Sequence, residues 1–269
     1  MSVKTISIHS SRGGTGKTVI ATNLAVILAN KGFSVALLDL DFRAPSLAMV
    51  FSEGIKLPVK CWLNDFLNGK CPAKQIFTDV AGNYNLKGRL LIGLANPAVE
   101  AMRNVMEKSR AWEVTAVKRL FLLLSVLNDM RVDFCIFDTS PGMQYSSVNA
   151  IVSSDISIIV TTLDSLDLKG TEDMLTELYD ALDKHVMILT NKSSPEIGTK
   201  SSETYEKVAA RLEKILKHPV ISVIPCYCDV LQTQRTSLLA VEKPNHPFVK
   251  NLGEVVEKLE KELPILMGT

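Results

Sequence analysis

Eight residues near the start of the chain combine glycine, lysine and threonine in a spacing that suits phosphate binding. Residues 11–18 read S-R-G-G-T-G-K-T. Glycines at positions 13, 14 and 16 let the backbone turn tightly and point its N–H groups into the turn. Lys17 adds a positive charge, and Thr18 adds a hydroxyl for a metal ion. The pattern therefore predicts a site for a nucleoside triphosphate with Mg²⁺.

The loop departs from the strict phosphate-loop pattern at one position. That pattern requires glycine at position 11, where this chain has Ser11, and a basic residue, Arg12, precedes the double glycine. An apolar run before the loop and a helix-like run after it supply the expected strand and helix. We expect the nucleotide to contact the whole loop: Ser11, Arg12, Gly13, Gly14, Thr15, Gly16, Lys17 and Thr18.

Asp138 follows the apolar residues 134–137 and precedes T-S-P-G. An aspartate in that place can hold Mg²⁺ through water, and Gly142 can move its N–H towards a terminal phosphate. Such an aspartate can also simply cap a helix. Because a phosphate loop is present in the same chain, we predict the metal role for Asp138.

Asp39 and Asp41 stand two residues apart at the end of another apolar run. On an extended chain both side chains point to the same side, which we expect to be the phosphate side. One carboxylate can then belong to the metal site, and the other can orient the attacking water. A solvated loop would also accommodate both acids.

Short apolar runs that alternate with helical stretches must position these residues. This alternation predicts an α/β fold of the P-loop type, a doubly wound, mostly parallel sheet with helices on both faces. Ligands bind beyond the carboxyl ends of such strands, where the polar residues above are found. The expected strands are residues 3–9, 34–38, 89–94, 133–137, 156–161, 186–190 and 220–224. Two helical core faces are expected, one formed by Val117, Leu120, Phe121, Leu124 and Leu127, the other by Val208, Leu212, Ile215 and Leu216.

Length and composition favour a single domain over residues 1–269, with a variable segment at about 56–110. The formal charge of +1 does not mark the chain as an obligate nucleic-acid binder. The early start of the first strand and the short apolar runs predict a cytoplasmic protein.

Five scattered cysteines indicate reduced thiols rather than a disulfide framework. Cys135 lies in an apolar run and is expected in the core. Cys226 and Cys228 could bind a soft metal, although the sequence supplies no second pair nearby to complete a site.

Several motifs together resemble the ParA/MinD group of deviant Walker A ATPases over almost the full length. They are R-G-G-T-G-K-T at 12–18, D-L-D at 39–41, D-T-S-P-G at 138–142, I-P at 224–225 and H-P-F at 246–248. The resemblance implies an ATP- and Mg²⁺-dependent switch in which Asp41 serves hydrolysis and Asp138 is the Walker B aspartate. It also implies that Asn191 and the segment around Pro225 contact adenine.

The resemblance further implies a homodimer that forms around two ATP molecules. In the family, a lysine at the second loop position reaches the partner's nucleotide, and this chain has Arg12 there. Arginine keeps the charge but differs in length and shape. Arg12 is therefore expected to act in trans, the alternatives being a contact within one subunit or a solvated side chain.

The resemblance does not identify the cargo, nor does it decide whether the protein positions or partitions it. Stable membrane docking is doubtful, because residues 255–269 present no cationic face. A basic patch for non-specific DNA could come from Arg103, Lys108, Arg110, Lys118, Arg119 and Arg131, although a solvated helix face explains these residues equally well. Two further interpretations are a slow ATPase adaptor that recruits a protein activator or other partner through residues 56–110, and a metallocentre-maturation ATPase that uses Cys226 and Cys228.

Overall fold

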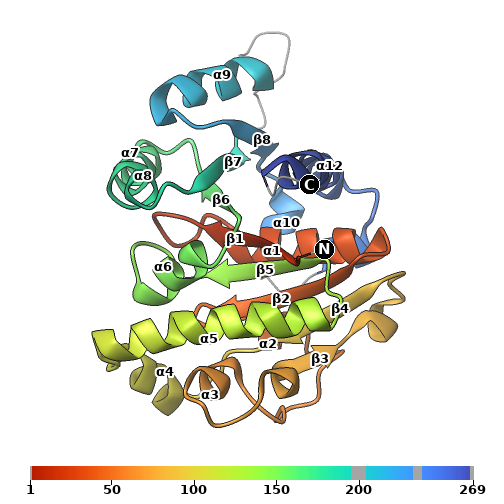
Figure 1. Ribbon diagram of the computed structural model, residues 1–269. Coiled ribbons are helices and arrows are strands. Elements are labelled where there is room, and N and C mark those ends of the chain that lie inside the picture. The colour runs from red at the N-terminus through yellow and green to blue at the C-terminus, as the bar shows by residue number, and fades with distance from the viewer. Residues whose placement is uncertain (1, 195–203, 233–237, 267–269) are drawn as a thin grey trace.

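The computed structural model describes residues 2–194, 204–232 and 238–266. Its centre is an eight-stranded sheet with the strand order β3-β4-β2-β5-β1-β6-β7-β8 (Figure 1). Every neighbouring pair is parallel except the edge pair β3 and β4. The strands are β1 Lys4–His9, β2 Ser34–Leu40, β3 Phe77–Asp79, β4 Arg89–Gly93, β5 Phe134–Thr139, β6 Ile156–Thr161, β7 His185–Ser193 and β8 Val220–Pro225. The predicted doubly wound α/β fold is confirmed, with β3 as an additional strand.

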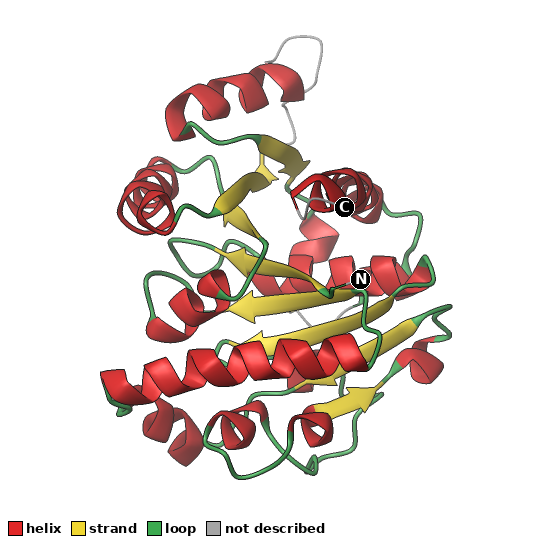
Figure 2. Ribbon diagram, in the orientation of Figure 1, coloured by secondary structure: helices red, strands yellow, loops and turns green. Residues whose placement is uncertain are grey.

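Helices cover both faces of the sheet, as the ribbon coloured by secondary structure shows (Figure 2). Side chains alternate along each buried strand, so Val35 and Leu37 join one core and Ala36 and Leu38 the other. Helices α1 and α12 pack on the first face, and α3 and α5 pack on the second. The helices are α1 Lys17–Asn30, α2 Leu47–Val50, α3 Leu63–Leu67, α4 Val99–Met106, α5 Arg110–Asp129, α6 Tyr145–Val152, α7 Ser165–Met174, α8 Asp180–Leu182, α9 Tyr205–Leu216, α10 Cys228–Gln232, α11 Leu239–Glu242 and α12 Pro247–Leu266, with the 3-10 turns η1 Ala73–Ile76 and η2 Ala81–Tyr84 and a π-helical segment, η3 Leu175–Tyr179.

Segment 56–110 contributes to the same sheet. It supplies the edge strand β3 and its neighbour β4, together with helices α3 and α4. The predicted variability of this segment stays a prediction. No helix in the described residues is long and apolar enough to span a membrane.

Two predicted core faces are wrong in part. On α5, Leu120 and Leu127 are buried, but Phe121 is 50% exposed, and Leu123 is buried instead. On α9, Ile215 is 43% exposed beside the buried Leu212 and Leu216. A helix rotates by about 100° per residue, so an apolar neighbour one position from the buried face already points towards solvent.

The prediction that all five cysteines are reduced is also wrong. Cys61 and Cys71 form a disulfide whose Cα atoms are 6.5 Å apart. The chain turns back around α3 and brings together two residues that a scattered sequence pattern does not pair. Cys135 is free and buried, as predicted, and Cys226 and Cys228 are free.

Candidate nucleotide-binding site

The phosphate loop joins the end of β1 to the start of α1, and its glycines are required by geometry. Gly14 and Gly16 have φ angles of 85° and 103°, a region that side chains with a Cβ rarely adopt. Gly16 is also crowded, because a Cβ there would lie 2.5 Å from Asn191 Nδ2. Since α1 begins at Lys17, the unpaired N–H groups of its first turn face the loop.

Lys17 is held across the base of this loop. Its side chain is buried, and Nζ donates a hydrogen bond of 2.8 Å to Ser10 Oγ. Ser10 Oγ in turn donates to the carbonyl oxygen of Arg12, at 2.6 Å. The ammonium group is therefore fixed beneath the loop, where phosphate oxygens would lie.

Asp138 lies at the end of β5 and is fully buried. Its two carboxylate oxygens accept no well-formed hydrogen bond from the described residues. Burial and, to a smaller extent, Asp41 raise the pKa of Asp138 to about 7, against the opposing effects of the Thr18 hydroxyl and the Lys17 ammonium. A buried carboxylate without partners, close to a hydroxyl, fits the oxygen ligands that Mg²⁺ takes directly or through water.

Asp39 is also fully buried, but the polypeptide uses both of its oxygens. Oδ1 accepts the N–H of Asp41, and Oδ2 accepts those of Ser46 and Leu47, all at 3.2 Å. Burial and the nearby Asp138 raise the pKa of Asp39 well above its usual value. Asp39 therefore anchors loop 41–47, and its predicted contact with the metal stays a prediction.

Asp41 faces the phosphate loop. Its Oδ1 accepts hydrogen bonds from Ser140 Oγ at 2.7 Å and from the N–H of Ala44 at 3.2 Å. It lines a cavity of about 330 Å³ together with Lys17 and Thr18. Arg43 lines the same cavity and was not among the predicted residues. The remaining lining residues are Gly13, Gly14, Gly16, Val19, Ala44, Ser46 and Pro141.

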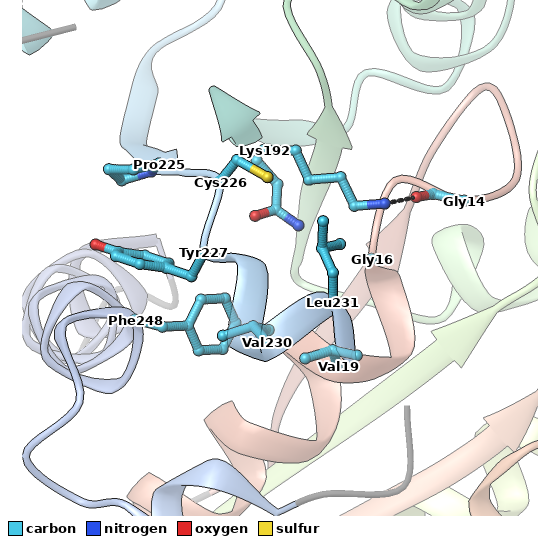
Figure 3. Close-up of a pocket in the computed structure, with 11 residues that line it drawn as sticks. Gly14, Gly16, Val19, Lys192, Pro225, Cys226, Tyr227, Val230, Leu231 and Phe248 are labelled. Carbon is cyan, nitrogen blue, oxygen red and sulfur yellow. Dashed lines mark hydrogen bonds between the residues drawn. The ribbon is translucent and has the colours of Figure 1, made fainter. Parts of the chain in front are cut away.

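A second cavity, of about 210 Å³, adjoins the first and shares Gly14, Gly16 and Val19 with it. Its walls are more apolar, and Figure 3 shows Tyr227 and Phe248 opposite Lys192 and the loop. The other lining residues are Asn191, Pro225, Cys226, Val230 and Leu231. One cavity lined by Lys17 and Thr18 and a neighbouring cavity lined by Tyr227 and Phe248 match the phosphate and base parts of a nucleotide.

Two side chains that line this second cavity donate hydrogen bonds to the phosphate loop. Asn191 Nδ2 donates to the carbonyl oxygen of Thr15 at 2.8 Å, and Lys192 Nζ donates to that of Gly14 at 2.6 Å (Figure 3). Asn191 and Pro225 were predicted for the base, whereas Lys192, Tyr227 and Phe248 were missed as site residues. The H-P-F motif that contains Phe248 was the available sequence signal.

Gly142 and Arg12 stand apart from both cavities. The N–H of Gly142 donates to the carbonyl oxygen of Ser10 at 2.8 Å, so a contact with phosphate requires this glycine to turn. Arg12 is exposed, and its guanidinium makes no hydrogen bond or ion pair with the described part of the chain.

Cys226 and Cys228 lack the neighbours of a metal site. Cys226 lines the second cavity, and Cys228 is exposed at the start of α10. Among the described residues, no cluster of three or more histidine, cysteine or acidic side chains is arranged to hold a metal.

A phosphate loop after the first strand of a parallel sheet, with an acidic residue at the end of the neighbouring strand, defines a P-loop nucleoside triphosphatase. A family model described as an AAA domain matches residues 3–189. Its match and those of the relatives below show that the chain belongs to the ParA/MinD family of P-loop ATPases.

The relatives cover most of this chain. An uncharacterized ATP-binding protein of Methanocaldococcus jannaschii is 29% identical over 259 residues, which cover 94% of this chain and 86% of that protein. A putative septum site-determining protein MinD of Guillardia theta is 27% identical over 88% of this chain and 81% of its own length. An iron-sulfur cluster carrier protein of Pyrococcus furiosus is 23% identical over 98% and 88%.

A solved structure supports the same fold. The septum site-determining protein MinD of Pyrococcus horikoshii, in complex with Mg-ADP, superimposes with a TM-score of 0.75. The two chains are 21% identical, and the match covers 98% of each.

Proposed function

We propose that this protein is an ATP-binding and ATP-hydrolysing molecular switch that uses Mg-ATP-dependent dimerisation to control the positioning or partitioning of a cellular cargo. The observation that carries the proposal is the meeting of two unlike cavities at Gly14, Gly16 and Val19. One offers Lys17 and backbone N–H groups to phosphates beside Asp138. The other offers apolar and aromatic walls to a base.

Each predicted residue then receives a role. Asp138 and Thr18 hold Mg²⁺, and Lys17 binds phosphate oxygens and stabilises charge that develops during hydrolysis. Asp41, held by Ser140, orients the attacking water. Asn191 and Pro225 contact adenine, as they line the base cavity. When bound, Mg²⁺ would neutralise phosphate charge.

The dimer is supported by the position of Arg12 on the exposed side of the loop. Because its guanidinium has no partner in the described part of the same subunit, it is available for a second subunit's nucleotide. Arginine binds phosphate oxygens through two N–H groups, which suits a contact in trans. We propose that residues 1–269 form one such switch domain.

The six basic residues predicted to bind non-specific DNA lie on α4, on α5 and in the segments next to these helices. Two of the six predicted basic residues already have partners, since Arg119 donates to the carbonyl oxygen of Phe66 and Lys108 lies over the ring of Trp112. Arg110 and Arg131 lie at opposite ends of α5, which spans about 30 Å. The six residues therefore do not share one compact patch.

The alternative functions differ in what stimulates hydrolysis. An adaptor would hydrolyse ATP slowly and recruit its partner through residues 56–110. A metallocentre-maturation ATPase would need ligands beyond Cys226 and Cys228, although one relative is named an iron-sulfur cluster carrier protein.

Measuring hydrolysis with and without DNA, lipid vesicles and candidate protein partners separates these functions. Stimulation by DNA alone would support partitioning, and stimulation by lipid vesicles would support positioning. Stimulation by neither would favour the adaptor. A protein that binds no ATP would contradict the proposed switch.

A further inference from the structure

A buried histidine ties the loop that follows β5 to a helical segment on the other side of the phosphate loop. His9 is the last residue of β1, and its Nε2 lies 2.9 Å from the carbonyl oxygen of Gly142. Its Nδ1 lies 2.8 Å from the hydroxyl of Tyr179. Both side chains have no exposed surface, so these bonds are shielded from water.

The direction of these hydrogen bonds follows from the chemistry of the groups. A carbonyl oxygen only accepts, so Nε2 must carry the proton and donate to Gly142. Burial and, to a smaller extent, Lys17 lower the pKa of His9 to about 4 against the opposing effect of the hydrogen bond to Gly142, so the ring is neutral near pH 7. Nδ1 therefore accepts from the Tyr179 hydroxyl.

Burial raises the pKa of the Tyr179 hydroxyl, which therefore keeps its proton near pH 7 and can donate it to His9. Beside this pair, Ser157 Oγ on β6 lies 2.6 Å from Ser7 Oγ on β1.

Tyr179 ends the π-helical segment η3, which interrupts the helical run between α7 and α8. π segments are rare, and they occur frequently at functional sites. Helix α7 has a second tie to the phosphate loop, because Ser11 Oγ lies 3.2 Å from Thr171 Oγ1. Ser11 is the residue that replaces the glycine of the strict pattern. The helical run 165–182 therefore contacts the phosphate loop through Thr171 and is linked to loop 140–144 through His9.

Gly142 is held on both sides in this structure. Its N–H donates to Ser10, and its carbonyl oxygen accepts from His9 and from the N–H of Gln144, the latter at 2.9 Å. With φ at 71°, Gly142 occupies a conformation open to glycine. If the N–H leaves Ser10 for a phosphate, the rotation of Gly142 also displaces the carbonyl group that His9 holds.

We propose that His9 is a positioning residue that, through Tyr179, couples loop 140–144 to the helical run 165–182. This inference rests on the proposed function, because it gives the loop the task of sensing ATP. The coupling makes the helical run respond when Gly142 turns towards a terminal phosphate. Helix position would then report whether ATP or ADP is bound.

Amide hydrogen exchange of the full chain without nucleotide tests the coupling directly. His9→Asn removes the donor that reaches Gly142, and Tyr179→Phe removes the hydroxyl but keeps the ring. Both variants are expected to raise exchange at least threefold in segments 142–144 and 175–179 together. His9→Gln, whose side chain can place an N–H near the position of Nε2, should restore protection at 142–144. Tyr84→Phe, far along the chain and only partly buried, serves as the matched control and should change neither segment.

The rate of ATP hydrolysis provides a second measurement, which a purely structural role of His9 and Tyr179 would leave unchanged. His9→Asn and Tyr179→Phe should lower kcat about tenfold and change KM less than twofold, while thermal unfolding shows both variants folded. Exchange that rises in only one of the two segments would overturn the coupling, as would unchanged exchange in both variants. If the proposed function is wrong, the unaltered protein will not hydrolyse ATP. The exchange measurement does not depend on that result and would still show whether His9 couples the two segments.

Discussion

Asp39 and Asp138 lie opposite each other on the neighbouring strands β2 and β5, and both are fully buried. Two carboxylates so placed disfavour each other's ionisation, and Asp138 helps to raise the pKa of Asp39. The chain satisfies Asp39 with three backbone N–H groups and leaves Asp138 without a well-formed hydrogen bond from the described residues, although the Thr18 hydroxyl lies near it. The fold therefore keeps one carboxylate of the pair for a cation.

Asp138 should destabilise the ligand-free protein at high pH. Its pKa rises from 3.8 to about 7 on folding, so its protonated form favours the native state. The stabilisation is fully present below pH 3.8 and is lost as pH rises through 7, a difference of about 4 kcal/mol at most. Asp138→Asn should therefore be more stable than the unaltered protein at pH 8, by up to this amount, and should lose Mg²⁺-dependent nucleotide binding.

Urea unfolding at pH 5 and pH 8 measures this effect. Asp39 adds to it in the same direction, because loss of the Asp138 charge also lowers the pKa of Asp39. The gain in unfolding free energy from Asp138→Asn should be larger at pH 8 than at pH 5. An equal gain at both pH values would mean that Asp138 is not the group that titrates.

Gly16 and Gly32 offer a matched pair of substitutions. Both have φ of 103°, but a Cβ at Gly16 would lie 2.5 Å from Asn191 Nδ2, whereas nothing lies within 4 Å at Gly32. Gly32→Ala should cost about 1 to 2 kcal/mol from backbone strain alone. Gly16→Ala should cost more and should also weaken ADP binding at least tenfold.

Unfolding and nucleotide titrations distinguish the two substitutions. Loss of ADP binding in Gly32→Ala as well would point to a general effect of strain and not to the contact between Gly16 and Asn191.

Arg12 should govern association without supporting the fold. Arg12→Ala should abolish ATP-dependent dimerisation and leave ADP affinity within about twofold, because its side chain has no partner in the described part of its own subunit. Arg12→Lys keeps the charge and should retain part of the association. Light scattering with Mg-ATP measures the mass, and an Arg12→Ala protein that still dimerises and hydrolyses ATP normally would rule out the role in trans.

Much of this architecture follows from local sequence. The continuous apolar runs predict buried parallel strands, and the glycine spacing at 13–16 predicts the phosphate loop, because both patterns depend on residues that are neighbours in the chain. Strand ends then place Asp41 and Asp138 at one edge of the sheet. These features could be predicted without knowledge of the tertiary structure.

Features that depend on tertiary packing could not be predicted in this way. The base cavity joins Tyr227 and Phe248 to the phosphate loop across more than 200 residues. The H-P-F motif marks Phe248, but it does not show that this residue packs beside the loop. Asp39 and Asp41 look equivalent in sequence, yet loop 41–47 folds back on Asp39 and takes both of its oxygens. The pairing of Cys61 with Cys71 has the same origin, in a turn of the chain around α3.

The molecular mass of the Asp41→Ala protein in the presence of Mg-ATP tests the proposed switch most directly. Asp41 lines the phosphate cavity and is held by Ser140, so its removal should stop hydrolysis while binding of the nucleotide persists. We expect light scattering to show a stable dimer with Mg-ATP, a monomer with ADP, and turnover reduced at least a hundredfold. A monomer in both nucleotides with turnover equal to that of the unaltered protein would contradict the assignment of Asp41 and the switch built on it.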